Sequence, residues 1–247
     1  MANRKIRWVG IDYGQCLMTP SGMRNPRMFG DIAKMVGKQD RIPVWVDRMR
    51  QLKEMYGSYS DIKEGHRDEI ESYVLENDHK AYEIFKMKES ELLGVSEGGY
   101  EFLEWLTGRG FRANIVSELK KTLGPVGSDM ITAFLIAKGI IRYFKYFYTP
   151  QGKIDLDTGE RDNKYAGTSK ETGTLYDLLV EELAQGGITP DECVMIGDKP
   201  STDLIPPKKR GFVTIQYTGH IDTGPCEAAD YRAKDFVEVK HVMERLI

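Results

Sequence analysis

The sequence is poor in the residues and segments that mark several classes of protein. It has three cysteines, an odd number without metal-binding spacing, which argues against a disulfide scaffold or a zinc ribbon and favours a reducing compartment. No run approaches the ~20 apolar residues that a membrane helix needs. The apolar segment near the N-terminus is too short and too interrupted for a signal peptide. We therefore expect a cytoplasmic protein with no membrane association.

Neither sign of charge is in excess. The chain has 35 Lys and Arg residues against 38 Asp and Glu, for a formal net charge of -3. Nucleic-acid binding usually requires a basic surplus or a basic face, so we expect no nucleic-acid partner. We interpret the basic run at 208–210 as a solvated helix end. Internal repeats and low-complexity tracts are also absent.

Predicted strands alternate with predicted helices over most of the chain, which is typical of a parallel α/β sheet. The polar segment 151–168 contains the turn signal Asp157-Thr158-Gly159, and we interpret it as a small hairpin outside this pattern. The expected strands cover 6–12, 112–117, 143–148, 193–196 and 212–216, and the expected helices cover 100–107, 126–138, 172–184 and 236–246.

The stretch from about 26 to 93 interrupts the alternation. Its apolar residues recur at helical spacing, and it contains no convincing strand. We therefore predict two domains: an α/β core formed by 1–17 and 96–247, and a helical domain inserted at 18–95. At 247 residues the chain is long enough to form both.

Polar residues stand where the predicted strands end. Asp12, Ser117 and Asp198 each close a strand, Asp203 follows five positions after Asp198, and Lys170 opens the helix that precedes the later strand. The carboxyl ends of parallel strands meet at one edge of the sheet, where ligands bind. Carboxylates and a lysine at that edge predict a site for Mg²⁺ and phosphate, because hard oxygen ligands hold Mg²⁺ and the cations neutralise phosphate charge.

These motifs together resemble those of the haloacid dehalogenase (HAD) superfamily. The four matching segments occur in order: Val9–Asp12, Ile115–Ser117, Lys170 with its following helix, and Val194–Asp203, which contains the pattern GDxxxTD. The resemblance implies a doubly wound, Rossmann-like parallel sheet. It also implies that the insertion is a C1-type helical cap, which closes over small substrates and excludes water.

The resemblance further implies a role for each residue. Asp12 would attack the substrate and form an aspartyl intermediate, Ser117 would hydrogen-bond the transferring group, and Lys170 would stabilise the intermediate. Lys164 competes for the role of Lys170, but the spacing to the following helix favours Lys170. The implied Mg²⁺ ligands are Asp12, the carbonyl of Gly14, Asp198 and Asp203. The implied protein is a Mg²⁺-dependent hydrolase of a small phosphorylated or phosphonate metabolite, acting as a monomer or homodimer.

The first motif departs from the DxDGT pattern of the superfamily's phosphatases. Gly14 replaces the second aspartate, which is the general acid and base, and Gln15 and Cys16 follow it. Acid–base assistance is worth roughly 10²–10⁴ in rate, so its loss requires an explanation. One interpretation is that another side chain takes over. The candidates are Tyr13, Gln15, His66 and His79.

Other interpretations remain open. Phosphonoacetaldehyde hydrolases also lack the second aspartate, keep the metal, and use a cap lysine as a Schiff base. Alternatively, catalysis is lost and the chain is a silent HAD-fold binding or regulatory protein. A dehalogenase-like hydrolase of carbon–halogen bonds is a further alternative, although such enzymes need no Mg²⁺.

We interpret Cys16 as a packing residue rather than a nucleophile. The candidate cap lysines are Lys34, Lys38 and Lys53.

Overall fold

A computed structural model describes residues 5–19, 26–57, 62, 65–118 and 124–247, with the backbone alone at 89–92. The chain divides into two compact units. The first, which we call the α/β unit, comprises Met1–Thr19 and Val95–Ile247, and the second, the helical unit, comprises Pro20–Gly94. The predicted insertion was 18–95, so the division falls within two residues of the expected positions.

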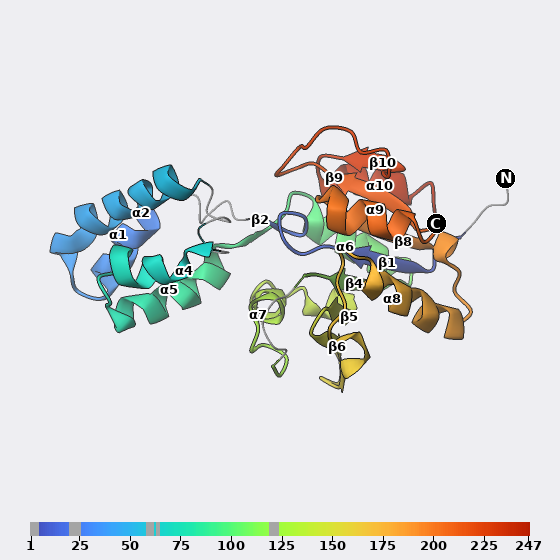
Figure 1. Ribbon diagram of the computed structural model, residues 1–247, viewed down its shortest axis with the longest axis horizontal. Coiled ribbons are helices and arrows are strands. Elements are labelled where there is room, and N and C mark those ends of the chain that lie inside the picture. The colour runs from blue at the N-terminus through green and yellow to red at the C-terminus, as the bar shows by residue number, and fades with distance from the viewer. Residues whose placement is uncertain (1–4, 20–25, 58–61, 63–64, 119–123) are drawn as a thin grey trace. The chain divides into compact units, whose positions relative to one another are not determined.

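An eight-stranded sheet forms the centre of the α/β unit (Figure 1). The six neighbouring strands from β10 to β5 in the spatial order given below pair in parallel. The two strands at the other edge, β6 and β7, join by antiparallel pairing. Strand β1 is buried along its whole length, as expected for a parallel strand covered on both faces. In spatial order the strands are β10 (Tyr231–Ala233), β9 (Val213–Tyr217), β8 (Cys193–Gly197), β1 (Trp8–Ile11), β4 (Ala113–Val116), β5 (Phe144–Thr149), β6 (Gly152–Asp155) and β7 (Arg161–Asp162).

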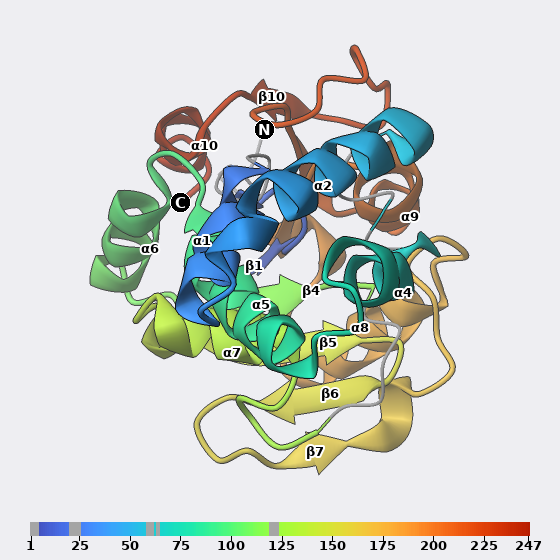
Figure 2. The same cartoon turned by 90° about the vertical axis from the view of Figure 1, so that its left-hand side faces the viewer.

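The segment predicted as a separate hairpin belongs to this sheet. Strand β6 pairs antiparallel with β5, and β7 pairs antiparallel with β6, which makes one edge of the sheet mixed (Figure 2). The alternation on β6 explains the difference, because Gly152 and Ile154 are buried while Lys153 and Asp155 are partly exposed. Lys145 and Asp155 form an ion pair of 2.8 Å between the two strands. The predicted parallel sheet is thus correct for six strands only.

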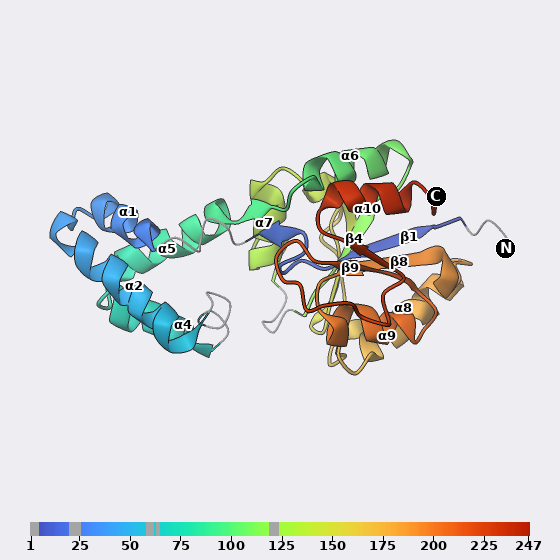
Figure 3. The same cartoon turned by 90° about the horizontal axis from the view of Figure 1, so that it is seen from above.

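Helices cover both faces of the sheet. Helices α6 (Gly99–Gly108) and α10 (Phe236–Met243) lie on one face, and α8 (Thr174–Gln185) and α9 (Ile205–Lys208) lie on the other (Figures 2 and 3). Phe102 and Phe236 join the first pair with ring centroids 5.3 Å apart. On the opposite face the core includes Trp8, Tyr176, Leu179 and Phe212. This two-sided covering confirms the predicted doubly wound architecture.

Shorter elements complete the α/β unit. Helix α7 (Met130–Ala137) starts four residues later than the predicted 126–138, because Asp129 caps it by accepting the N–H groups of Ile131 and Thr132. Single helical turns occupy Ile141–Tyr143, Asn163–Tyr165 and Pro190–Glu192, and a π-turn occupies Pro200–Leu204.

The helical unit has its own apolar core. The buried residues include Phe29, Trp45, Met49 and Phe85, and the rings of Phe29 and Phe85 stack with centroids 5.5 Å apart. Its elements are α1 (Arg27–Met35), the turn Gln39–Arg41, α2 (Ile42–Tyr56), α4 (Arg67–Glu69), the π-turn Ile70–Val74 and α5 (His79–Leu92). This part of the chain is helical as predicted.

Two short strands mark where the chain leaves and re-enters the α/β unit. Strand β2 (Met18–Thr19) pairs with β3 (Gly94–Val95) in a separate two-stranded sheet.

Among the residues that the structure describes, no helix is long and apolar enough to cross a membrane.

Candidate functional site

Three of the predicted site residues directly follow three neighbouring strands. Asp12 comes after β1, Ser117 after β4 and Asp198 after β8. The Asp12 N–H donates to the Ile196 carbonyl at 2.8 Å, and the Ser117 N–H donates to Tyr148 at 3.0 Å. These bonds continue the parallel ladders by one residue. The prediction that the three residues share the carboxyl edge of the sheet is therefore confirmed.

Lys170 joins the carboxylates. Its Nζ donates to Asp12 Oδ1 at 2.7 Å and to the Val116 carbonyl at 2.8 Å, and it lies 2.5 Å from Asp203 Oδ1. The residue is only 1% exposed. Burial opposes its charge, but Asp12 and Asp203 outweigh burial and hold the pKa of Lys170 well above its usual value. Lys170 is therefore a buried ammonium that bridges two aspartates.

The competing lysine lies elsewhere. Lys164 is exposed and pairs with Glu181 Oε2 at 3.6 Å. The prediction that Lys170 opens a helix needs correction, because α8 begins four residues later, at Thr174. Gly173, in the left-handed conformation (φ 85°), separates the lysine from the helix. Lys170 thus lies in a turn and not in a helix. From there its side chain reaches the carboxyl ends of β1 and β4.

Asp203 is fixed on both carboxylate oxygens. Oδ2 accepts the Lys199 N–H at 3.0 Å, and Oδ1 accepts the Thr202 hydroxyl at 3.1 Å in addition to pairing with Lys170. The residue lies in the π-turn Pro200–Leu204, directly beside the end of β8. The Asp203 side chain is accordingly held in one orientation toward the other carboxylates.

Asp12, Asp198 and Asp203 form a cluster that suits a cation. One oxygen from each lies within 4.8 Å of the others. Burial and the neighbouring charge of Asp203 raise the pKa of Asp12 to about 8 and that of Asp198 to about 7. Lys170 supplies one positive charge to three carboxyl groups, so all three can be ionised together only if a further cation binds. Closely spaced carboxylate oxygens are the donors that Mg²⁺ prefers, and the donor set fits such an ion.

Gly14 adds no side chain to the site. A Cβ built at this position meets no atom within 4 Å, so the space beside it is open to a larger residue. The backbone of Gly14 forms an isolated bridge with Met18, which folds the loop back on itself. Its carbonyl as a metal ligand, and the Ser117 hydroxyl as a partner of the transferring group, remain predictions.

The loop residues proposed as replacements for the missing acid differ in setting. Tyr13 is buried and packs edge-on against Phe134, with centroids 5.3 Å apart. Gln15 is partly exposed and has a positive φ of 58°. Cys16 is fully buried, and burial together with Asp12 raises the pKa of its thiol well above the usual value. Cys16 is thus a packing residue, as expected, and not a thiolate nucleophile.

The candidates in the helical unit are engaged within that unit. Lys34 pairs with Asp31 at 3.3 Å, and Lys38 pairs with Asp78 at 2.7 Å. His79 pairs with Glu71 at 2.8 Å, while His66 approaches Glu69 at 3.0 Å and stacks on Tyr56. Lys53 belongs to α2.

Sequence reasoning missed contacts around Lys170. Glu118 accepts the Lys170 N–H through Oε2 at 3.1 Å, and the Tyr176 hydroxyl donates to the Thr202 carbonyl at 2.9 Å. Both residues lie next to or within matched segments, at Ser117 and in the helix after Lys170. The sequence gives no sign of these two hydrogen bonds, because Glu118 binds a backbone N–H and Tyr176 binds a backbone carbonyl.

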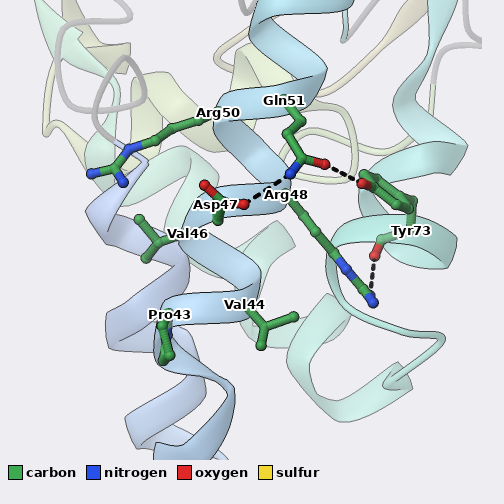
Figure 4. Close-up of a pocket in the computed structure, with 8 residues that line it drawn as sticks. All are labelled: Pro43, Val44, Val46, Asp47, Arg48, Arg50, Gln51 and Tyr73. Carbon is green, nitrogen blue, oxygen red and sulfur yellow. Dashed lines mark hydrogen bonds between the residues drawn. The ribbon is translucent and has the colours of Figure 1, made fainter.

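A pocket of about 550 Å³ lies in the helical unit and contains none of the predicted site residues (Figure 4). Several of its polar groups already have partners: Gln51 donates to the Asp47 carboxylate at 2.8 Å, and Arg48 donates to the Tyr73 backbone carbonyl at 2.8 Å. The carboxylate cluster at the sheet edge therefore remains the candidate site.

Solved structures similar to this one share its fold. A HAD phosphatase from Thermococcus onnurineus is 21% identical, with 96% of this chain and 98% of that chain covered at a TM-score of 0.56. YfnB from Bacillus subtilis, solved with bound magnesium, is 15% identical, with coverage of 97% and 99% and a TM-score of 0.54. A 2-haloacid dehalogenase from Pseudomonas syringae is 14% identical, with coverage of 98% and 100% and a TM-score of 0.54.

These likenesses extend over nearly the whole chain, including the inserted helices. No family model matches the sequence, and no curated protein matches it. At such low identity the structures establish the fold, and the chain has the fold of the HAD superfamily. The resemblance to the HAD superfamily that the sequence predicted is therefore confirmed for the fold. The cap type and the activity need arguments from the site itself.

Proposed function

We propose that the protein is a Mg²⁺-dependent hydrolase of a small phosphorylated or phosphonate metabolite, with Asp12 as nucleophile. The observation that carries the proposal is the Lys170 ammonium, buried between Asp12 Oδ1 at 2.7 Å and Asp203 Oδ1 at 2.5 Å. A structural protein gains little from burying such a group, because desolvation offsets the attraction between the charges. A site for a dianionic phosphoryl group, in contrast, needs positive charge beside its carboxylates, which Lys170 and a bound Mg²⁺ would supply together.

The metal would be held mainly by Asp12 and Asp198, with the Gly14 carbonyl as a further ligand. Asp203 already accepts hydrogen bonds on both oxygens. It therefore contributes through its remaining lone pairs, or through water. When bound, Mg²⁺ would supply charge neutralisation and orientation to the phosphoryl oxygens.

The side chains of Asp12, Lys170 and Ser117 each have a role in the proposed reaction. An Asp12 oxygen attacks phosphorus, the bond from phosphorus to the leaving oxygen breaks, and water later cleaves the aspartyl phosphate to release inorganic phosphate and free Asp12. Lys170 donates to Asp12 Oδ1, which holds the carboxylate in place and leaves the other oxygen for attack. The Ser117 hydroxyl would bind a phosphoryl oxygen.

The glycine at position 14 limits which leaving groups the substrate can have. With no acid at this position, the leaving group must depart unprotonated or take its proton from water. This favours substrates whose leaving group is already a weak base, such as acyl or aryl phosphates. The phosphonatase alternative would require Lys34, Lys38 or Lys53 as a Schiff base, and phosphonoacetaldehyde in the assay below tests it.

A turnover assay tests the proposal. Acetyl phosphate, p-nitrophenyl phosphate, sugar phosphates and phosphonoacetaldehyde are each supplied with Mg²⁺ or with EDTA, and Asp12→Asn is the control. Metal-dependent phosphate release that is lost in Asp12→Asn supports the hydrolase. The absence of turnover across the panel, together with no Mg²⁺ binding by calorimetry, would instead favour a silent binding protein. Halide release from a 2-haloacid without metal would favour the dehalogenase alternative.

A further inference from the structure

One arginine outside the carboxylate cluster joins the two segments that carry Lys170 and Asp203. Arg210, just beyond α9, donates from Nε and Nη2 to Asp177 Oδ1 and Oδ2 at 2.6 and 2.7 Å. Its Nη1 donates to the Pro206 carbonyl at 2.9 Å. Asp177 lies in the first turn of α8 and Pro206 lies in α9. The two-bond fork fixes the plane of the guanidinium, which a lysine cannot do.

The guanidinium also lies against the turn that carries Lys170. A Cβ at Gly173 would lie 2.3 Å from Arg210 Nη1, 2.5 Å from Nη2 and 2.6 Å from Cζ. The group therefore occupies the space where a side chain at position 173 would be. The Gly173 N–H in turn donates to the Lys170 carbonyl at 3.1 Å. Arg210 thus packs directly on the short turn 170–173.

The same arginine belongs to the segment that holds Asp203. Helix α9 directly follows the π-turn Pro200–Leu204, and α8 and α9 lie on the same face of the sheet (Figure 3). The Tyr176 hydroxyl makes a second link, to the Thr202 carbonyl at 2.9 Å. Two contacts therefore join the segment that carries Lys170 to the segment that carries Asp203, one made by Tyr176 and the other by Arg210.

We propose that Arg210 is a positioning residue that keeps Lys170 in register with Asp203 and Asp12. The proposal rests on the proposed function, which gives Lys170 its role. The Arg210 side chain is 19% exposed and that of Asp177 is 56% exposed, and the two parallel hydrogen bonds hold the guanidinium in place. Its effect lies in restraining the turn 170–173. The run 208–210 is accordingly more than the solvated helix end predicted from the sequence.

Chemical labelling of lysine amines tests this without a substrate. Arg210→Met and Arg210→Lys are compared with the wild type during brief acetylation, and labelling at Lys170 is measured by peptide mass spectrometry. Lys234, with a side chain 71% exposed, is the internal reference. Arg112→Met is the matched control, because Arg112 also binds an aspartate, Asp157 at 2.6 Å, and a backbone carbonyl, but it precedes β4, at the opposite end of that strand from Val116, whose carbonyl Lys170 binds.

We expect Lys170 to be labelled about tenfold faster in Arg210→Met, because local opening of the turn exposes the amine. Arg210→Lys should behave in the same way, since its ammonium restores the charge without the fork. Arg112→Met should leave Lys170 unchanged. The inference is overturned if Lys170 stays protected in Arg210→Met, if Arg112→Met exposes it equally, or if Arg210→Lys matches the wild type.

Kinetics then separate the two proposals. If the wild type hydrolyses p-nitrophenyl phosphate, kcat of Arg210→Met should fall about tenfold with KM within about twofold, since Lys170 acts on the reacting group more than on binding. A fall in kcat equal to that of Arg112→Met would contradict positioning. If the wild type shows no turnover, the proposed function fails while the labelling result still decides the role of Arg210.

Discussion

Gly197 and Asp203 approach so closely that only glycine fits at the end of β8. A Cβ at Gly197 would lie 2.4 Å from Asp203 Cβ and 2.6 Å from its Cγ. Asp203 cannot retreat easily, because Lys170, Thr202 and the Lys199 N–H hold its oxygens. The glycine of the GD pair is therefore a steric requirement of the carboxylate cluster.

Gly197→Ala should displace Asp203 and weaken its bond with Lys170. We expect a loss of about 1–3 kcal/mol in the free energy of unfolding, the usual cost of overpacking. The matched control is Gly14→Ala, where the added Cβ meets nothing within 4 Å; it should change stability by no more than about 0.5 kcal/mol. Urea unfolding measures both. Equal losses in the two variants would show that the contact with Asp203 does not matter.

Gly14→Asp should supply the missing acid without a steric clash, because the space beside Gly14 is open. A sugar phosphate has a poor leaving group, so its turnover should rise by roughly 10². Turnover of p-nitrophenyl phosphate, whose leaving group needs no proton, should change little. Gly14→Asn, equal in size but unable to donate an acidic proton, is the control. If both variants respond alike, the open position does not act through acid catalysis.

Metal binding should strengthen as the pH rises. The pKa of Asp12 is raised from 3.8 to about 8, and that of Asp198 to about 7, by burial and by Asp203. Between pH ~4 and ~8 the folded metal-free protein keeps protons that the unfolded chain has lost, so its stability falls as the pH rises through this window. Mg²⁺ competes with those protons and should restore stability.

Thermal unfolding with and without Mg²⁺ checks this at pH 6 and pH 8. The increase in Tm on adding Mg²⁺ should be larger at pH 8 and should be much reduced in Asp198→Asn. An increase that is the same at both pH values, or that persists in Asp198→Asn, would show that the ion binds outside the cluster.

Glu182 should matter for stability and not for the site. Its carboxylate accepts the hydroxyls of Tyr148 at 2.9 Å and Tyr165 at 3.0 Å, and Lys153 at 2.8 Å. Glu182→Leu would leave two buried hydroxyls without an acceptor, at a cost of about 2–4 kcal/mol. Its neighbour provides the control: Glu181, exposed and 3.6 Å from Lys164, should cost under about 0.5 kcal/mol when changed to Leu. Differential scanning calorimetry compares the two, and similar losses would contradict the assigned network.

Much of the site could be predicted because it lies on regular structure. Asp12, Ser117 and Asp198 follow buried strands, and parallel strands place their ends at one edge. The bridging of Asp12 and Asp203 by Lys170 could be expected only from the resemblance, since the turn that carries Lys170 has no periodicity. Glu118, Tyr176 and Arg210 were missed or misread for a related reason. Their partners are backbone groups or a distant aspartate, and tertiary contacts of this kind leave no local pattern in a sequence.

The pairing of β2 with β3 has a consequence for how this protein could be rebuilt. Because Thr19 and Gly94 belong to two paired strands of one small sheet, the helical unit begins and ends at points that are close in space. A graft can therefore use the same two junctions. Replacing 20–94 with the insertion of another protein of this fold would keep all the strands of the eight-stranded sheet in the chain. The helical unit is in this sense an exchangeable module, and chimeras joined at these points would show which properties travel with it.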